Sequence, residues 1–151
     1  MKRSEALKPL SREHHQALYA AKVIRDQKGG GDSAGKFVEF WEEEALVHFR
    51  IEEEVLLPGS GLTGPDRDPE VARMLSEHLA LRRAAAKIES GEASPEDLVA
   101  TAELLTSHVR FEERELFPRI ESQLSEAELE RLTIAIQEAE KAARDQRFRP
   151  S

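Results

Sequence analysis

Two segments of this chain, sixty residues apart, carry the same pattern of side chains. Residues 48–58 read HFRIEEEVLLP and residues 108–118 read HVRFEERELFP, so His, Arg, two Glu, Leu and Pro recur at identical offsets. In each copy a histidine precedes a glutamate by four residues. On an α-helix that spacing places an imidazole and a carboxylate on one face, one turn apart. The repeat therefore predicts two equivalent helices that present the same pair of polar side chains.

The duplication extends beyond these two segments. Glu13-His14 and Glu77-His78 form a second repeated pair, sixty-four residues apart, and both histidines lie among apolar residues at helical spacing. The first half of the chain therefore corresponds to the second half, and each half supplies two helices. Such a duplication predicts a helical bundle with an approximate two-fold axis through its core.

Local signals place the boundaries of five helices. Ser11 is expected to cap the first helix. Asp68-Pro69 and Ser94-Pro95, each a capping residue followed by proline, are expected to open the third and the fourth. Pro58 and Pro118 are expected to end the second and the fourth. The predicted helices span residues 12–28, 33–57, 69–90, 95–117 and 126–146.

Four long helices with short connections pack most simply as an antiparallel up-down-up-down bundle. We expect an all-α fold in which residues 1–120 form this four-helix bundle and residues 121–151 form an additional C-terminal helix. That helix either packs on the bundle or extends from it as a partner-binding segment. The residues expected to pack are apolar and at helical spacing: Leu129, Leu132, Ile136 and Ala139.

Composition argues against several classes of function. The net charge of −8 argues against a surface for nucleic acid or anionic membrane, because phosphates require basic side chains. The absence of cysteine excludes disulfides, Fe–S clusters, thiolate-ligated zinc and cysteine nucleophiles. No signal peptide or segment of roughly 20 apolar residues is present to enter a bilayer. We therefore expect a cytoplasmic protein without nucleic-acid or membrane partners, and the sequence names no protein partner.

Four of the five histidines fall one to a helix, each on the face expected to point inward: His14, His48, His78 and His108. A single histidine on an apolar face is usually a core residue. Four buried imidazoles together with Glu52 and Glu112 need partners for all of their polar atoms. A metal centre satisfies them together, since borderline transition metals accept imidazole and carboxylate ligands. Six converging ligands predict two metal ions bridged by the two carboxylates.

Other metal sites fit the spacing less well. The His-Glu-x-x-His of zinc metalloproteases and the Glu-x-x-His of ferritin-like bundles are both absent. Glu53 and Glu113 are expected on the solvent face, because the residue after Glu52 or Glu112 points away from the histidine. Glu113 stays an alternative ligand in case the helix is distorted. A bundle without metal would leave four buried histidines without a ligand.

These residues together resemble the haemerythrin-like (HHE cation-binding) family. Glu13-His14, His48-x-x-x-Glu52, Glu77-His78 and His108-x-x-x-Glu112 match the four helices of that family over about residues 7–120. The resemblance implies a bridged, non-haem di-iron centre, with zinc or another divalent metal as a substitute. It implies dioxygen or a related small ligand as a further partner. The metal ligands that it implies are His14, His48, Glu52, His78, His108 and Glu112.

The third helix departs from the oxygen carriers of that family, which have a second histidine one turn from the first. The corresponding positions here hold Met74 and Arg82. One metal ion would therefore keep an open position or take a further ligand. The candidates for that ligand are His15, Glu44 and Glu115.

The expected function is that of a haemerythrin-like metal-binding protein that binds or senses dioxygen or iron. Two alternatives use the same centre: a redox enzyme acting on peroxide or nitric oxide, and a metal-dependent interaction or regulatory module. No nucleophile triad, phosphate loop or dinucleotide motif indicates catalytic residues or residues that bind an organic cofactor. A protein that binds metal and dioxygen is therefore favoured over a dedicated enzyme.

Overall fold

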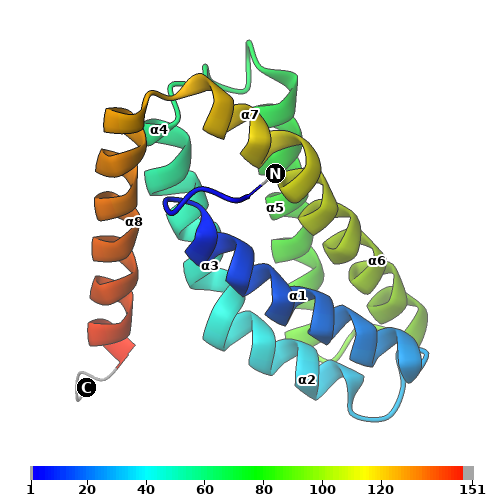
Figure 1. Cartoon of the computed structure of the whole chain (residues 1–151). Coiled ribbons are helices and arrows are strands. Elements are labelled where there is room, and N and C mark those ends of the chain that lie inside the picture. The colour runs from blue at the N-terminus through cyan, green and yellow to red at the C-terminus, as the bar shows by residue number, and fades with distance from the viewer. Residues whose placement is uncertain (1, 148–151) are drawn as a thin grey trace.

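The computed structural model describes residues 2–147 as an antiparallel four-helix bundle with a fifth helix beside it (Figure 1). The first long helix is α1 (Lys8–Asp26), and the third is α5 (Pro69–Glu89). The second is continuous through α2 (Ser33–Phe40), η1 (Trp41–Ala45), α3 (Leu46–Ile51), η2 (Glu52–Leu56) and α4 (Leu57–Gly59). The fourth joins α6 (Pro95–Phe111), η3 (Glu112–Leu116) and α7 (Phe117–Gln123), and α8 (Glu126–Arg147) follows. The predicted all-α, up-down-up-down architecture is confirmed.

Two helix starts have the predicted capping chemistry. The side chain of Asp68 accepts hydrogen bonds from the backbone N–H groups of Glu70 and Val71, at 3.0 and 3.2 Å. Ser94 and Asp97 form a reciprocal capping box at the start of α6. Each cap satisfies backbone donors that have no partner within the helix.

The start of α1 differs from the prediction. The helix begins at Lys8, one turn before the expected start, and Leu7 occupies its N-cap position without a side-chain hydrogen bond. The backbone carbonyl of Ser4 instead accepts from the N–H groups of Leu7 and Lys8. The expected cap, Ser11, lies inside the helix, and its hydroxyl donates to Glu113 Oε2 at 2.8 Å. The N-cap prediction for Ser11 was wrong because a turn upstream of it satisfies the first donors.

The fourth helix does not end at Pro118, contrary to the prediction, and continues to Gln123. A π-helical turn precedes each proline of the repeat: η2 before Pro58 and η3 before Pro118. In these turns the N–H of the residue before proline bonds a carbonyl five residues earlier. The wider turn accommodates a ring that would otherwise clash with the preceding turn of an α-helix.

Apolar side chains form two clusters separated along the bundle by a polar layer. One cluster includes Phe37, Trp41, Phe49 and Leu105, and the other includes Leu10, Phe117 and Ile120. Between the two clusters lie six buried polar side chains, which are His14, His48, Glu52, His78, His108 and Glu112. The centre is therefore covered by apolar side chains along the bundle axis in both directions.

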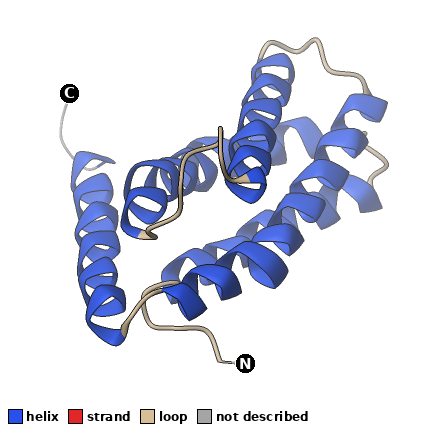
Figure 2. Ribbon diagram, turned by 90° about the horizontal axis from the view of Figure 1, so that it is seen from above, coloured by secondary structure: helices blue, strands red, loops and turns tan. Residues whose placement is uncertain are grey.

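Helix α8 lies at one side of the bundle (Figure 2). It packs against α3 and η2, and its Leu132 and Ile136 are buried in the second apolar cluster. Leu129 and Ala139 are partly buried against the same cluster, as the sequence indicated. The domain boundary between residues 120 and 121 stays a prediction, and residues 148–151 lie outside the described part of the chain. Among residues 2–147, no helix combines the length and the apolar composition required to cross a membrane.

Substitution of Asp68 tests how much this helix cap contributes to stability. Its buried carboxylate caps α5 and also accepts hydrogen bonds from the guanidinium of Arg119 on α7. Asp68→Ala should lower the free energy of unfolding by about 1–2 kcal/mol, mainly through the lost cap. Asp68→Asn keeps a capping side chain and should lower it by less than about 1 kcal/mol, since Arg119 is partly exposed. Urea unfolding followed by the fluorescence of Trp41, the only tryptophan, measures both. Equal stability of the two variants would contradict the capping role.

Candidate metal centre

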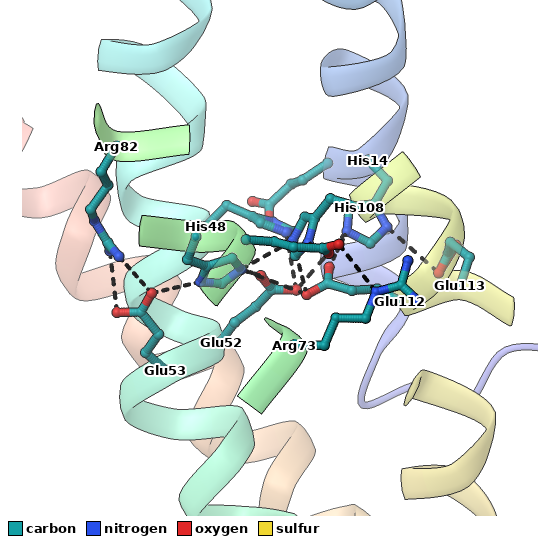
Figure 3. Close-up of polar contacts among 12 residues, drawn as sticks. His14, His48, Glu52, Glu53, Arg73, Arg82, His108, Glu112 and Glu113 are labelled. Atoms are coloured by element: carbon teal, nitrogen blue, oxygen red, sulfur yellow. Dashed lines mark hydrogen bonds and ion pairs between the residues drawn. The ribbon is translucent and has the colours of Figure 1, made fainter. Parts of the chain in front are cut away.

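Four helices bring six side chains together in the middle of the bundle (Figure 3). All six are buried, and both carboxylates have no exposed surface. They form two overlapping groups in which the ligand atoms lie within 4.8 Å of one another. One group consists of His14, His48, Glu52 and Glu112, and the other of His78, His108, Glu52 and Glu112.

The carboxylate of Glu52 lies among three imidazoles. Its Oε2 is 3.3 Å from Nε2 of His48 and 4.0 Å from Nε2 of His14. Its Oε1 is 3.2 Å from Nε2 of His78. Glu52 comes from the first half of the duplication and His78 from the second, so this carboxylate joins the two halves.

Glu112 occupies the equivalent position in the second half. Its Oε1 is 2.9 Å from Nε2 of His14, and its Oε2 is 3.3 Å from Nε2 of His108. Nε2 of His78 is 3.7 Å from the same Oε2. Each half of the duplication thus supplies one pair of histidines, and both carboxylates serve both pairs.

Several inward-facing atoms have no hydrogen-bond partner within residues 2–147. They are Nε2 of His48, both carboxylate oxygens of Glu52, and Oε2 of Glu112. Buried polar atoms without partners are costly, and proteins rarely leave several of them together. In addition, Nε2 of His78 lies 3.1 Å from Nε2 of His108, close enough for both ring nitrogens to bind one cation. The donor set of imidazole nitrogens and carboxylate oxygens therefore fits a transition-metal centre.

A second layer of carboxylates, which we call the outer carboxylates, binds the other nitrogen of the rings. Nδ1 of His48 lies 2.9 Å from Oε1 of Glu13, and Nδ1 of His108 lies 2.8 Å from Oε1 of Glu77. These contacts are equivalent under the duplication, and each joins the two helices of one half. Because the N–H at Nδ1 donates to a carboxylate, Nε2 is left to face the centre.

The remaining two outer carboxylates join the two halves. Nδ1 of His78 lies 2.6 Å from Oε2 of Glu53, and Nδ1 of His14 lies 3.6 Å from Oε2 of Glu113. Both glutamates were expected on the solvent face, and that expectation was wrong. Their helices take π-helical turns that begin one residue earlier and change the direction of the side chains. The signal for their role was present in the sequence, since a second Glu follows the ligand Glu at the same offset in both copies.

Three of the outer carboxylates are bound in turn by donors farther out. The guanidinium of Arg82 contacts both oxygens of Glu53, at 2.8 and 3.2 Å. Arg82 stands where the oxygen carriers have their second histidine, and it acts here on the carboxylate that orients His78. Arg73 contacts Glu77 at 3.1 Å, and Glu113 accepts from Ser11.

The three candidates for an additional ligand lie outside the two groups of ligand atoms. His15 is exposed on α1. Glu115 is exposed as well, and its Oε2 lies 3.7 Å from Arg73. Glu44 lines a small cavity beside His14 and His48, together with Glu13 and apolar residues. Of the three candidates, Glu44 is the one that lines this cavity.

The cavity beside the centre is mainly apolar. Its walls include three ligand histidines, and its apolar residues are Ala17, Phe40, Ala45, Phe49, Leu105 and Val109. It leaves about 10 Å³ for the centre of a water-sized molecule, which is close to the smallest space that holds one water. Only a very small ligand fits there without movement of side chains.

In the absence of metal, neighbouring charges outweigh burial in setting the pKa values of three histidines and of Glu112. Burial alone would lower the pKa of His48, but the charge of Glu52 and the hydrogen bond to Glu13 raise it to about 10. The same opposition of burial and nearby carboxylates raises the pKa of His78 to about 11 and that of His108 to about 9. Burial would raise the pKa of Glu112, but the charge of His108 and its hydrogen bond hold it well below 4.5. Without metal, protons on the imidazoles balance the buried carboxylates.

Comparison with known proteins gives one match. A family model described as the Hemerythrin HHE cation binding domain matches residues 5–120, which include the first three helices of the bundle and most of the fourth. No curated protein and no solved structure matches the chain significantly. Helix α8 follows the matched region.

The raised pKa values predict how the stability of the metal-free protein depends on pH. A group whose pKa is higher in the folded than in the unfolded state stabilises the folded protein. This contribution is complete below the unfolded pKa, here 6.5, and it is lost as the pH rises through the pKa of the folded state. The melting temperature of the metal-free protein should therefore fall between about pH 6.5 and pH 10. Metal should suppress this fall, because it replaces the protons on the imidazoles. Calorimetry across this range, with and without metal, measures the difference, and identical profiles would contradict the assignment.

Proposed function

Since the chain belongs to the hemerythrin HHE cation-binding family, we propose that its buried centre holds two iron ions and binds or senses dioxygen through them. The observation that carries the proposal is the sharing of Glu52 and Glu112 between two groups of ligand atoms. Each group offers two imidazoles and two carboxylates. Four protein donors to each ion would leave room in its coordination sphere for a small ligand.

Each residue of the centre has a separate part in this proposal. His14 and His48 would hold one ion and His78 and His108 the other, and Glu52 and Glu112 would serve both. Iron bound in this way supplies reversible electron transfer to a small oxidising ligand. The outer carboxylates hold the imidazoles with Nε2 directed inward, which raises their basicity and fixes their orientation.

The surroundings of the centre support a diatomic ligand over a larger substrate. The cavity beside His14, His48 and His108 has apolar walls formed by α1, the second helix and α6. Apolar walls disfavour water and ions, and they accept a small nonpolar molecule. Phe49 stacks on the ring of His78 with centroids 4.0 Å apart, so it also restricts rotation of that imidazole.

A bridged pair of ions predicts that both are lost together. Wild-type protein reconstituted with ferrous iron under anaerobic conditions should bind two ions per chain, one for each of the two groups of ligand atoms. Glu52→Ala and Glu112→Ala should each abolish binding of both ions. Glu54→Ala is the matched control, because Glu54 is exposed and pairs with Arg50 on the surface. Metal analysis after desalting gives the stoichiometry, and a variant that keeps one tightly bound ion would contradict the shared bridge.

Admission of oxygen to the reduced, loaded protein separates the functions that this centre supports. Reversible binding should give a visible absorption band that disappears when oxygen is removed. Irreversible oxidation with consumption of added peroxide would identify the redox enzyme instead. Failure to retain iron while zinc is retained would change the proposed metal, and failure to bind any metal would overturn the proposal.

The outer carboxylates should matter almost as much as the ligands. Glu53→Gln removes the charge that orients His78 and should weaken metal binding by about 10- to 100-fold, the usual effect of such partners. Glu54→Gln, one residue away and exposed, should leave the affinity within about twofold of wild type. Competition with a chromophoric chelator measures both affinities. Equal affinities of the two variants would show that Glu53 does not support the centre.

A further inference from the structure

The duplication places one groove in each half of the bundle, on the helix that carries the His-x-x-x-Glu pair. Residues 46, 47, 50, 51, 54 and 55 of α3 and η2 line the first groove. The residues sixty positions later, on α6 and η3, line the second groove. All six positions correspond, so the two grooves are equivalent features of the duplicated bundle.

Only the first groove has a helix across it. Helix α8 lies beside this part of the bundle (Figure 1), and it lines the first groove with Ala139, Ala142 and Ala143. The walls of the second groove come from α1, α5, α6 and η3 alone within residues 2–147. The second groove therefore has a different occupant, and its side chains indicate which.

Hydroxyl groups stand in the second groove where the first has apolar side chains. Thr106 and Ser107 are the equivalents of Leu46 and Val47. The hydroxyl of Thr106 accepts a hydrogen bond from Nη1 of Arg25 at 3.0 Å, which holds this side chain of α1 against α6. The second groove thus gains hydrogen-bond donors and loses the apolar surface on which a helix packs.

A salt bridge of the first groove is replaced in the second by two like charges. Arg50 binds Glu54 one turn later, with Nε and Oε2 2.9 Å apart. The equivalent residues are Arg110 and Arg114, and neither forms a hydrogen bond or ion pair with another of residues 2–147. Like charges at this spacing destabilise a helix by about as much as a salt bridge stabilises it. This pair becomes favourable when a negative group binds between the two guanidiniums.

The second groove keeps an excess of positive charge, since four arginines and two glutamates line it. Of the two glutamates, Glu115 lies 3.7 Å from Arg73, which also binds Glu77, and Glu103 forms no ion pair within residues 2–147. Three of the lining arginines have no carboxylate partner in the same part of the chain: Arg25, Arg110 and Arg114. In a chain of net charge −8, such a group of arginines favours an anionic ligand.

The size of the groove favours a small molecule over a further helix. Its volume of about 610 Å³ lies within the usual range for small-molecule sites. Arg25 from α1 and Arg73 from α5 reach over α6 from its two neighbours, and the Arg73 guanidinium lies 4.1 Å from the centroid of the Phe111 ring. These long side chains stand where close packing of a helix would need small ones.

We propose that the second groove binds a small polyanion that carries two or more phosphate groups. A guanidinium matches phosphate oxygens with two parallel hydrogen bonds, and each phosphate carries up to two negative charges. Arg110 and Arg114 would bind one phosphate group, while Arg25 and the hydroxyl of Ser107 would bind another. Thr106 and Arg114 are eight residues apart, about 12 Å along a helix, so a single phosphate spans only part of the groove.

Titration calorimetry with inorganic tripolyphosphate tests the proposal, with inorganic phosphate as the comparison. At 0.15 M ionic strength, charges farther apart than about 8 Å are screened, so loose attraction to the surface contributes little. Tripolyphosphate should bind at one site per chain, at least about tenfold more tightly than phosphate. Metal-free and metal-loaded protein should give the same affinity, and metal analysis after the titration shows whether the loaded protein has kept its metal. Backbone amide NMR shifts should locate the ligand at residues 106–115.

Arg114→Glu is the decisive variant, because it gives the second groove the opposite charges that Arg50 and Glu54 have in the first. It should weaken tripolyphosphate binding by about 10- to 100-fold, the effect of a lost charge-assisted hydrogen bond. It should leave the melting temperature of the ligand-free protein unchanged or raise it by about 1–2 °C. Arg83→Glu makes the same change of charge at an exposed position of α5 outside the groove, and its affinity should stay within about twofold of wild type.

Three results would overturn the proposal. Tripolyphosphate could bind no more tightly than phosphate, or Arg114→Glu and Arg83→Glu could weaken it equally, and either result would mean that the groove attracts anions without a defined site. Binding of an acidic helical peptide without binding of tripolyphosphate would assign the groove to a protein partner instead. Because the titrations include metal-free protein, each of these results leaves the proposed function of the metal centre untouched.

Discussion

The burial of Glu52 and Glu112 is the constraint on which the rest of the structure depends. Two carboxylates without exposed surface need compensating charge from every side. Four imidazoles provide it, each from a different helix, so the four helices must meet at one level of the bundle. The two apolar clusters above and below then exclude water and strengthen each of these interactions. Fold and centre are therefore consequences of one electrostatic requirement.

Charge alternates in layers from the axis outward. Glu52 and Glu112 contact the imidazoles, three of the imidazoles donate to outer carboxylates, and two of these carboxylates accept from Arg73 and Arg82. In a chain of net charge −8, this order explains why these arginines lie at the outer edge of a buried site. The same order gives a role to Arg82, which occupies the position where the oxygen carriers have a histidine. Arg82 binds Glu53 and does not face the centre.

Much of this arrangement could be predicted from the sequence, because it follows from helical periodicity. The four-residue spacing of His48 and Glu52, repeated in the second half, defines both the bundle and the inward face. The π-helical turns could not be predicted, since they depend on how the proline rings and buried carboxylates are accommodated together. That local change is why Glu53 and Glu113 were assigned to solvent. The start of α1 was missed for a related reason, as Ser11 binds a distant carboxylate and not its own backbone.

The two halves of the chain are more alike at the centre than at its outer edge. The imidazoles and both layers of carboxylates are repeated in the two halves, because any change there would leave a buried charge unbalanced. The partners of the outer carboxylates reach the surface, where water compensates for differences, so they are free to diverge into Arg82, Arg73 and Ser11. Differences between the halves therefore concentrate at the edge of the centre.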